Sequence, residues 1–491
     1  MELRLLILAD LHYAATADDA AGPARRRCLL GRELLRRAID DARRHGGFHA
    51  IALMGDLINR GEHSARSEQS LTELAGDLAE LAPHLPVLVL PGNHDGDPHR
   101  LLEIFCCSPG PRRIGEHRFF VFCDPYGPGD VCTRADEDRR RFREFASQGP
   151  GPIVVLQHNP IHPVIDEPYP YMPTNRPQIM QDYASAGAVL SVSGHYHKGT
   201  PPRTVDGVTY FTAPALCEAP FTYTLAHLRG REVELRPHRL VLESQTPLLD
   251  SHAHTEFAYC GSGISAESEI DRARTFGLGG LFLVEHSPQL YVTKEAFYTG
   301  QHVRWPELWR SGLHDRADAF RQAMLPRRSG FVRVGLEVEL DADDRLILAD
   351  KDRGWQDILV GAVHFLNKDH LEYSDAEMAS EFMRVNRKLL DYRIHVLAHP
   401  WRVFTWFKRT VPTHLYGELA DLLAEHQAAA EINCHLNSND PAFFEMCIDR
   451  GVKLALGTDA HLPHEMGDLH EHLAFLRQIA AGKPLGELLA F

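Results

Sequence analysis

The feature of this chain that most restricts its fold is a pattern that recurs along its length: a short apolar run ends in a residue able to bind a metal ion. In the first half the apolar runs span about residues 5–9, 50–54, 86–90, 153–156 and 189–192. Short apolar runs bounded by polar turns are typical of buried strands. Open α/β sheets place ligands at the carboxyl ends of such strands, so the runs predict a sheet that gathers these polar residues at one edge.

The residues that follow these runs are of the types that bind divalent metals. In chain order they are Asp10-Leu11-His12, Gly55-Asp56, Gly92-Asn93-His94-Asp95, His158 and Gly194-His195-Tyr196-His197. Alternate side chains of an extended chain share a face, so the Asp and His of the first motif point to the same side. A single such residue at a strand end is usually a cap, but five in this order argue against coincidence. The first half is therefore predicted to hold a metal site.

The order of these motifs resembles that of the calcineurin-like metallophosphoesterase superfamily over about residues 1–240. The GDLIN segment around Asp56 is most similar to the bacterial class that includes cyclic-nucleotide and glycerophospho-diesterases. The resemblance implies an α/β sandwich with two metals that clamp the attacking and leaving oxygens of a phosphoester. It implies that Asp56 bridges them, with Asp10, His12 and His197 on one metal and Asn93, His158 and His195 on the other.

The resemblance also implies roles for residues that do not bind metal. His94 would contact the phosphate and protonate the leaving group, and Asp95 would orient His94 through a hydrogen bond. Between two of the ligand runs lies a segment rich in Pro and Tyr, residues 167–173. It is either an ordered surface loop or a loop that covers the substrate, since its position places it near the metals.

The second half repeats the pattern after a change in composition near residue 243. No flexible linker marks the change, so we predict two packed domains, residues 1–243 and 244–491. Helical patterns, for example about residues 376–391 and 412–427, alternate with apolar runs, which favours a (β/α) barrel with its site at one face. The motifs that end the runs are Asp250-Ser251-His252-Ala253-His254, Glu285-His286, Glu337, His364, His399-Pro400 and Asp459-Ala460-His461.

This second order resembles the PHP superfamily, whose members include histidinol-phosphate phosphatases, over about residues 248–470. The resemblance implies a distorted (β/α)7 barrel with a trinuclear site. Its ligands would be His252, His254, Glu337 and Asp459 on one metal, Glu337, His364 and His399 on the second, and His286, His461 and Cys260 on the third. Many relatives have histidine where this chain has Cys260, so this thiol either binds zinc as thiolate or is inert and buried. Arg402 is a candidate to meet a phosphate oxygen or an ordinary packing arginine.

Composition restricts the function further. The net charge of −15 and the lack of a basic stripe argue against nucleic acid, and a small phosphorylated substrate is expected instead. Nine scattered cysteines form no disulfide framework, and no run is apolar enough for a signal peptide or a bilayer span, so a cytoplasmic location without membrane attachment is expected. Mixed imidazole and carboxylate ligands accept Mn, Zn or Fe, and the oligomeric state is left open.

The favoured function joins the two sites in sequence. The first would hydrolyse a phosphodiester, including a cyclic one, and the second would hydrolyse the resulting phosphomonoester with two or three further metals. One alternative is a nuclease for single-stranded nucleic acid, because both superfamilies contain nucleases. The other alternative is one active phosphoesterase domain joined to a metal-stabilised binding or regulatory module.

Overall fold

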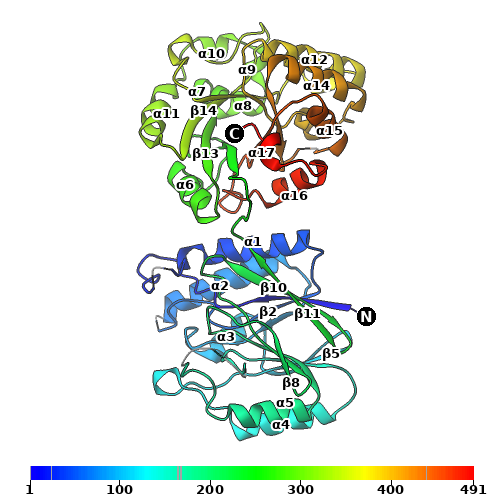
Figure 1. The fold of residues 1–491 in the computed structure, drawn as a ribbon. Coiled ribbons are helices and arrows are strands. Elements are labelled where there is room, and N and C mark those ends of the chain that lie inside the picture. The colour runs from blue at the N-terminus through cyan, green and yellow to red at the C-terminus, as the bar shows by residue number, and fades with distance from the viewer. Residues whose placement is uncertain (1, 24, 63, 163–164, 166–168, 438) are drawn as a thin grey trace. The chain divides into compact units, whose positions relative to one another are not determined.

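The computed structural model describes residues 2–491 apart from 24, 63, 163–164, 166–168 and 438, and the chain divides into two compact units, Met1–Val241 and Leu242–Phe491. Both units are mixed α/β (Figure 1). Within the described residues, no helix combines the length and the apolar character needed to cross a membrane.

The N-terminal unit contains two sheets. The first has five strands in the order β11 (Glu232–Arg239), β10 (Thr222–Arg229), β1 (Glu2–Leu8), β2 (Ala50–Leu53) and β3 (Val87–Val89). The second has six strands in the order β4 (Gly110–Ile114), β5 (His117–Val121), β6 (Ile153–Leu156), β7 (Ala188–Ser193), β9 (Val208–Thr212) and β8 (Arg203–Val205). Strands β1 to β3 run parallel, as do β5, β6, β7 and β9. Their carboxyl ends therefore carry the motifs found in the sequence.

The two sheets share one apolar core. Ile7 and Ala52 of the first sheet cluster with Val154 and Leu190 of the second. The short strands are buried on both faces, which requires helices on the outer sides. The helices of this unit are α1 (Gly31–Arg44), α2 (Ser64–Leu81), α3 (Pro98–Ile104), α4 (Asp136–Ser147) and α5 (Arg176–Ser185). Helices α4 and α5 lie together along the second sheet (Figure 1), and their aromatic residues pack on β5 and β6.

The C-terminal unit is built on a parallel sheet of seven strands in sequence order. They are β12 (Leu249–Ala253), β13 (Gly280–His286), β14 (Val332–Val338), β15 (Ile358–Gly361), β16 (Val396–Leu397), β17 (Ala429–Asn433) and β18 (Leu454–Gly457). A parallel bridge between Ala253 and Ala460 joins the first strand to the segment after the last, so the sheet nearly closes into a barrel. Strand β17 has no counterpart among the apolar runs singled out in the sequence.

Helices surround this barrel (Figure 1). They are α6 (Ala266–Thr275), α7 (Ser287–Tyr291), α8 (Lys294–Tyr298), α9 (Gln301–Arg304), α10 (Glu307–Arg310), α11 (Ala317–Met324), α12 (Asp375–Leu390), α13 (Arg402–Trp406), α14 (Tyr416–His426), α15 (Pro441–Asp449), α16 (His470–Ile479) and α17 (Leu485–Leu488). A cluster of mostly small side chains, such as Ala398 and Ala429, fills the barrel, and Phe491 packs beside it on Phe282 with ring centroids 4.9 Å apart. Phe282 lies in the first half of its strand, so the chain end packs away from the polar strand ends.

Candidate metal centres

The predicted ligands of the first half converge between the two sheets of the N-terminal unit. The Nε2 atoms of His12 and His197 are 3.1 Å apart, and the Nε2 of His158 is 3.1 Å from the Nδ1 of His195. Asp56 lies between the two pairs, with Oδ2 3.5 Å from the Nε2 of His12 and 3.4 Å from that of His158. One carboxylate thus faces a histidine pair on each side.

Asp10 and Asn93 complete this group. Asp10 is fully buried, accepts the backbone N–H of His195 at 3.1 Å, and has Oδ1 3.8 Å from the Nε2 of His197. Asn93 precedes His94, whose backbone N–H donates to Oδ1 of Asp56 at 2.9 Å. Among the described residues, the buried Oδ1 of Asn93 and Nε2 of His195 have no hydrogen-bond partner. Buried polar atoms without partners are rare in native proteins, so these atoms fit a site for cations.

The outer ring nitrogens show which lone pairs face the site. The Nδ1 of His158 is 2.6 Å from the carbonyl oxygen of Met54, and that of His197 is 2.6 Å from Oε1 of Glu218. A carbonyl or carboxylate can only accept, so each Nδ1 carries a proton and Nε2 is the nitrogen available to a metal. Metal-binding histidines are usually oriented in this way. Glu218 follows none of the apolar runs, and the sequence pattern did not identify it.

The backbone at these ligands is strained. Asp10, His12, Asp56 and His195 all adopt positive φ, between 45° and 65°. A non-glycine residue in this region costs about 1–3 kcal/mol, and such residues cluster at functional sites. The surrounding hydrogen bonds hold the conformation: the N–H of His12, for example, donates to the carbonyl of Asp56 at 2.9 Å.

Burial shifts the pKa values of this charged group. Burial raises the pKa of Asp10 to about 6 and holds the pKa of His12 well below its usual range. Burial also opposes a charge on His158, but the neighbouring Asp56 outweighs it and raises the pKa of His158 to about 9. The site without metal therefore holds protons where a cation would otherwise balance the carboxylates.

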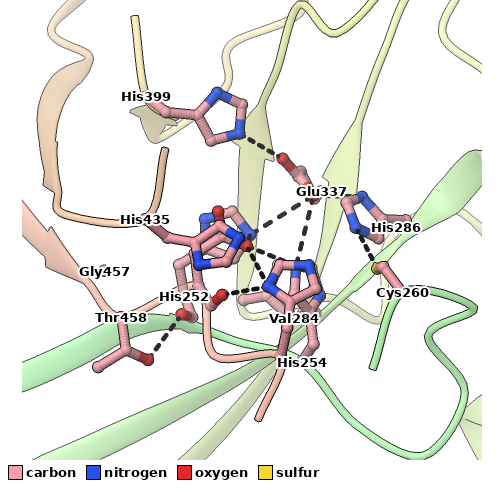
Figure 2. Close-up of polar contacts among 12 residues, drawn as sticks. His252, His254, Cys260, Val284, His286, Glu337, His399, His435, Gly457 and Thr458 are labelled. Atoms are coloured by element: carbon pink, nitrogen blue, oxygen red, sulfur yellow. Dashed lines mark hydrogen bonds and ion pairs between the residues drawn. The ribbon is translucent and has the colours of Figure 1, made fainter. Parts of the chain in front are cut away.

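The predicted ligands of the second half converge around Glu337, which is fully buried at the end of β14 (Figure 2). Five histidines place a ring nitrogen within 4 Å of its carboxylate: His286 at 2.5 Å, His399 at 3.0 Å, His252 and His364 at 3.5 Å and His254 at 3.9 Å. Asp459 accepts from the Nε2 of His254 at 2.8 Å. His461 stands beside His254 with ring centroids 5.0 Å apart.

The outer nitrogens of this group repeat the arrangement of the first site. The Nδ1 of His252 is 2.9 Å from Oε1 of Glu431, and that of His364 is 3.0 Å from Oε1 of Glu339. The Nδ1 of His254 is 3.0 Å from the carbonyl oxygen of Val284. These acceptors hold a proton on each Nδ1, so Nε2 is the nitrogen that faces inward and can bind a metal once it is deprotonated. The donor set therefore fits metal ions, although the sequence pattern identified neither Glu431 nor Glu339 as a partner.

Comparison with known proteins identifies the first unit. Residues 3–199 match the family model of the calcineurin-like phosphoesterases. The N-terminal unit carries a calcineurin-like phosphoesterase domain. The protein is thus a metal-dependent phosphoric ester hydrolase, and the family implies divalent metal cofactors. A search of curated proteins gave no match.

Solved structures give weaker similarities. A dimetal phosphatase from Danio rerio is 17% identical, with 48% of this chain and 98% of that chain covered and a TM-score of 0.38. The purple acid phosphatase PPD1 from yellow lupin (Lupinus luteus) seeds is 13% identical, with 49% and 52% covered and a TM-score of 0.35. A protein described as a histidinol phosphatase from Listeria monocytogenes is 13% identical, with 46% and 99% covered and a TM-score of 0.31. Scores this low do not bear on the chemistry of either unit.

In the calcineurin-like domain, the predicted hydrogen bond between Asp95 and His94 is wrong. The Nδ1 of His94 is 2.8 Å from the carbonyl oxygen of Asn59. Among the described residues, the carboxylate of Asp95 instead accepts the backbone N–H groups of Leu57, Ile58 and Gly92 at 2.7, 3.0 and 2.8 Å. Asp95 therefore joins the two ligand loops, and Asn59 orients the ring. Because the acceptor is a backbone carbonyl, the identity of residue 59 gave no signal for this contact in the sequence.

The Pro- and Tyr-rich segment contacts His195, one of the predicted metal ligands. Its first residues, 167 and 168, lie outside the described residues. In the part that the structure describes, the hydroxyl of Tyr169 donates to the carbonyl of His195 at 3.1 Å, and the ring of Tyr171 lies 5.2 Å from that of His195. These contacts place the described part of the loop beside His195, and its role in covering a substrate stays a prediction.

In the C-terminal unit, Cys260 lies beside His286, a predicted ligand of the third metal. Its Sγ is 3.4 Å from the Nε2 of His286 and accepts from the side-chain amide of Gln289 at 3.4 Å. Burial raises the pKa of the thiol above its ordinary value, so without a cation it stays protonated. The geometry allows both interpretations, a zinc-bound thiolate and an inert thiol.

Arg402 lines the cavity beside this site, yet its guanidinium already has partners. Its Nη2 is 2.5 Å from Oδ2 of Asp459 and 2.9 Å from Oδ1 of Asn433. The side chain is buried, and its charge lowers the pKa of Asp459, whose own burial acts in the opposite direction. Arg402 thus holds a predicted metal ligand in place, and its contact with a phosphate stays a prediction.

Proposed function

We propose that the protein is a bifunctional phosphohydrolase with one metal centre in each unit. The N-terminal dinuclear centre would hydrolyse a phosphodiester, including cyclic ones, and the C-terminal centre would hydrolyse the phosphomonoester that results. The observation that carries the proposal is the repeated geometry. In each unit a buried carboxylate at a strand end, Asp56 or Glu337, faces several histidines, and an acceptor holds the outer nitrogen of at least one of them, His158 or His364.

The residues of the first centre fit this chemistry. Bound metals would supply an activated water and neutralise the charge of the phosphate. The ligands in this proposal are Asp10, His12, Asp56, Asn93, His158, His195 and His197. A nitrogen of His94 lies within 4.8 Å of ligand atoms of His12 and Asp56. Since the Nδ1 of His94 faces the carbonyl oxygen of Asn59, Nε2 is the nitrogen that would protonate the leaving oxygen.

We assign residues 244–491 to the PHP superfamily as a distorted (β/α)7 barrel, and residues 1–243 to a metallophosphoesterase α/β sandwich. The parallel strand order and the ligands at strand ends support the barrel assignment. The ligands in this proposal are His252, His254, Cys260, His286, Glu337, His364, His399, Asp459 and His461. Metals such as Mn, Zn or Fe would serve both centres.

The experiment compares the two variants Asp56→Ala and Glu337→Ala on a panel of small phosphodiesters and phosphomonoesters with Mn added. Glu337→Ala should accumulate the phosphomonoester, and Asp56→Ala should leave the diester intact while hydrolysing added monoester. The exposed Glu425, changed to Ala, is the control for loss of a carboxylate. If neither variant accumulates a phosphorylated intermediate, the sequential reaction is refuted.

Two further measurements separate the alternatives. Cleavage of single-stranded DNA at rates above those for small esters would favour a nuclease, which the net charge of −15 disfavours. Elemental analysis that finds metal in only one unit would favour a single active domain joined to a binding or regulatory module. Isolation of metal-loaded Asp56→Ala and Glu337→Ala shows which unit holds the metal.

A further inference from the structure

A cavity of about 340 Å³ opens beside the candidate centre of the C-terminal unit. Three predicted metal ligands, His286, His364 and His461, line it together with Cys260. A volume of this size lies in the range of small-molecule sites. Because predicted metal ligands line it, a phosphate bound at the centre would place its ester group in this cavity.

The walls of the cavity are aromatic. Phe297, Tyr298, Phe365 and Trp406 line it, and the ring of Phe297 lies 5.3 Å from that of His286. These residues come from helix α8, the segment after β15 and helix α13. Planar side chains from separate elements thus surround the space next to the histidines.

Part of the cavity lining is apolar and exposed to solvent. Among the residues that the structure describes, ten large apolar side chains are exposed, and four of them line this cavity: Tyr298 at 44%, Trp406 at 53%, Leu436 at 58% and Leu462 at 40%. Exposed apolar groups gathered at one cavity indicate a binding site rather than random surface composition.

The charge of the lining restricts the ligand. Among the described lining residues, Arg402 is the sole side chain with a permanent charge, and its guanidinium pairs with Asp459. A second charged group on the substrate would therefore find no free partner among these lining residues.

We propose that the C-terminal centre acts on phosphomonoesters whose alcohol carries a planar, uncharged aromatic ring held against Trp406 and Tyr298. This inference rests on the proposed function of that centre and names its substrate class.

The test uses the Asp56→Ala chain loaded with Mn, so that the C-terminal centre alone acts. Naphthyl phosphate, an aryl ester, and adenosine monophosphate, a nucleoside ester, are compared with glycerol phosphate. At least one aromatic ester should exceed glycerol phosphate in kcat/KM by about tenfold, since stacking on one aromatic side chain gives an effect of this order. Trp406→Ala should raise KM for that ester by about tenfold and lower the ratio of its kcat/KM to that of glycerol phosphate by a similar factor.

Trp305→Ala is the matched control, because Trp305 is exposed to a similar degree, 49%, in the same unit and does not line this cavity. Equal kcat/KM for aromatic and glycerol esters, or a loss in Trp406→Ala no larger than in Trp305→Ala, would overturn the inference. Binding separates this failure from failure of the proposed function. If no ester is hydrolysed, phenylphosphonate should still bind the C-terminal centre about tenfold more tightly than methylphosphonate, and Trp406→Ala should remove this difference in affinity. Equal affinity of the two phosphonates for the chain with Trp406 intact would overturn the inference.

Discussion

Glu431 gives the sharpest test of how the C-terminal centre is oriented. Its carboxylate is fully buried, and its two oxygens have different partners. Oε1 accepts from the Nδ1 of His252 at 2.9 Å, whereas Oε2 accepts the backbone N–H of His399 at 2.8 Å and the side-chain amide of Asn433 at 3.0 Å. The substitution Glu431→Gln keeps the shape but replaces one acceptor oxygen by a donor.

The amide group of the glutamine has two possible orientations. If its NH2 replaces Oε2, it meets two donors, which leaves two hydrogen bonds unmade. If its NH2 replaces Oε1, it meets the Nδ1 of His252, which must then lose its proton. The second orientation breaks fewer bonds, so His252 should carry its proton on Nε2, the nitrogen that faces Glu337 at 3.5 Å. A protonated nitrogen cannot bind a metal.

The magnitude follows from this change of tautomer. Binding a metal would require His252 to give up a hydrogen bond of the charge-assisted kind, about 1.5–3 kcal/mol. That corresponds to a loss of roughly 10- to 150-fold in metal affinity at the C-terminal centre. The N-terminal centre should be unaffected.

Competition with a chelator measures the affinity, with metal content determined per chain. The matched control is Glu425→Gln, at an exposed position of α14. Circular dichroism of the metal-free variant checks that it is folded. Wild-type metal affinity in folded Glu431→Gln would refute the argument from the tautomer of His252.

Three further predictions follow from contacts and burial. Gly92→Ala should abolish the proposed diesterase activity and leave the monoesterase activity intact, because the new Cβ would lie 2.1 Å from Oδ1 of Asp56. Full diesterase activity in Gly92→Ala would contradict this. The control Gly76→Ala has open space around its Cβ in α2 and should raise the free energy of unfolding by about 0.5–1 kcal/mol. Burial opposes a charge on His254, but its carboxylate neighbours raise its pKa to about 10, so metal binding near neutral pH should release a proton from this ring. The stability that the charge on His254 gives the metal-free protein should be lost as pH rises through about 10. Calorimetry in buffers of different ionisation enthalpy measures the proton release, and an absence of released protons would contradict the prediction. Cys260→Ala should lower zinc content by about one ion per chain and Cys260→His should retain it, whereas unchanged content in both would show an inert thiol.

Much of the strand framework could be predicted from sequence because the buried strands are continuously apolar. The runs that end at Asp10, Asp56 and Glu337 each correspond to a strand, β1, β2 and β14. Strand β17 escaped prediction for a physical reason. Its segment begins Ala428-Ala429-Ala430, and alanine favours helices, so the local sequence continues the helical pattern before it. Only burial between β16 and β18 makes this segment a strand.

By itself, the sequence determined which residues are available to bind metals, because ligand chemistry depends on side-chain type and because apolar runs end where strands end. The tertiary structure decided how those residues are held. It set the left-handed backbone conformation at Asp10. It also brought together segments distant in the chain: Glu218 and Glu431 accept from the ring nitrogens of His197 and His252, and His94 pairs with Asn59 rather than Asp95. Such contacts leave no local periodicity, since each depends on one hydrogen bond made after the sheets have packed.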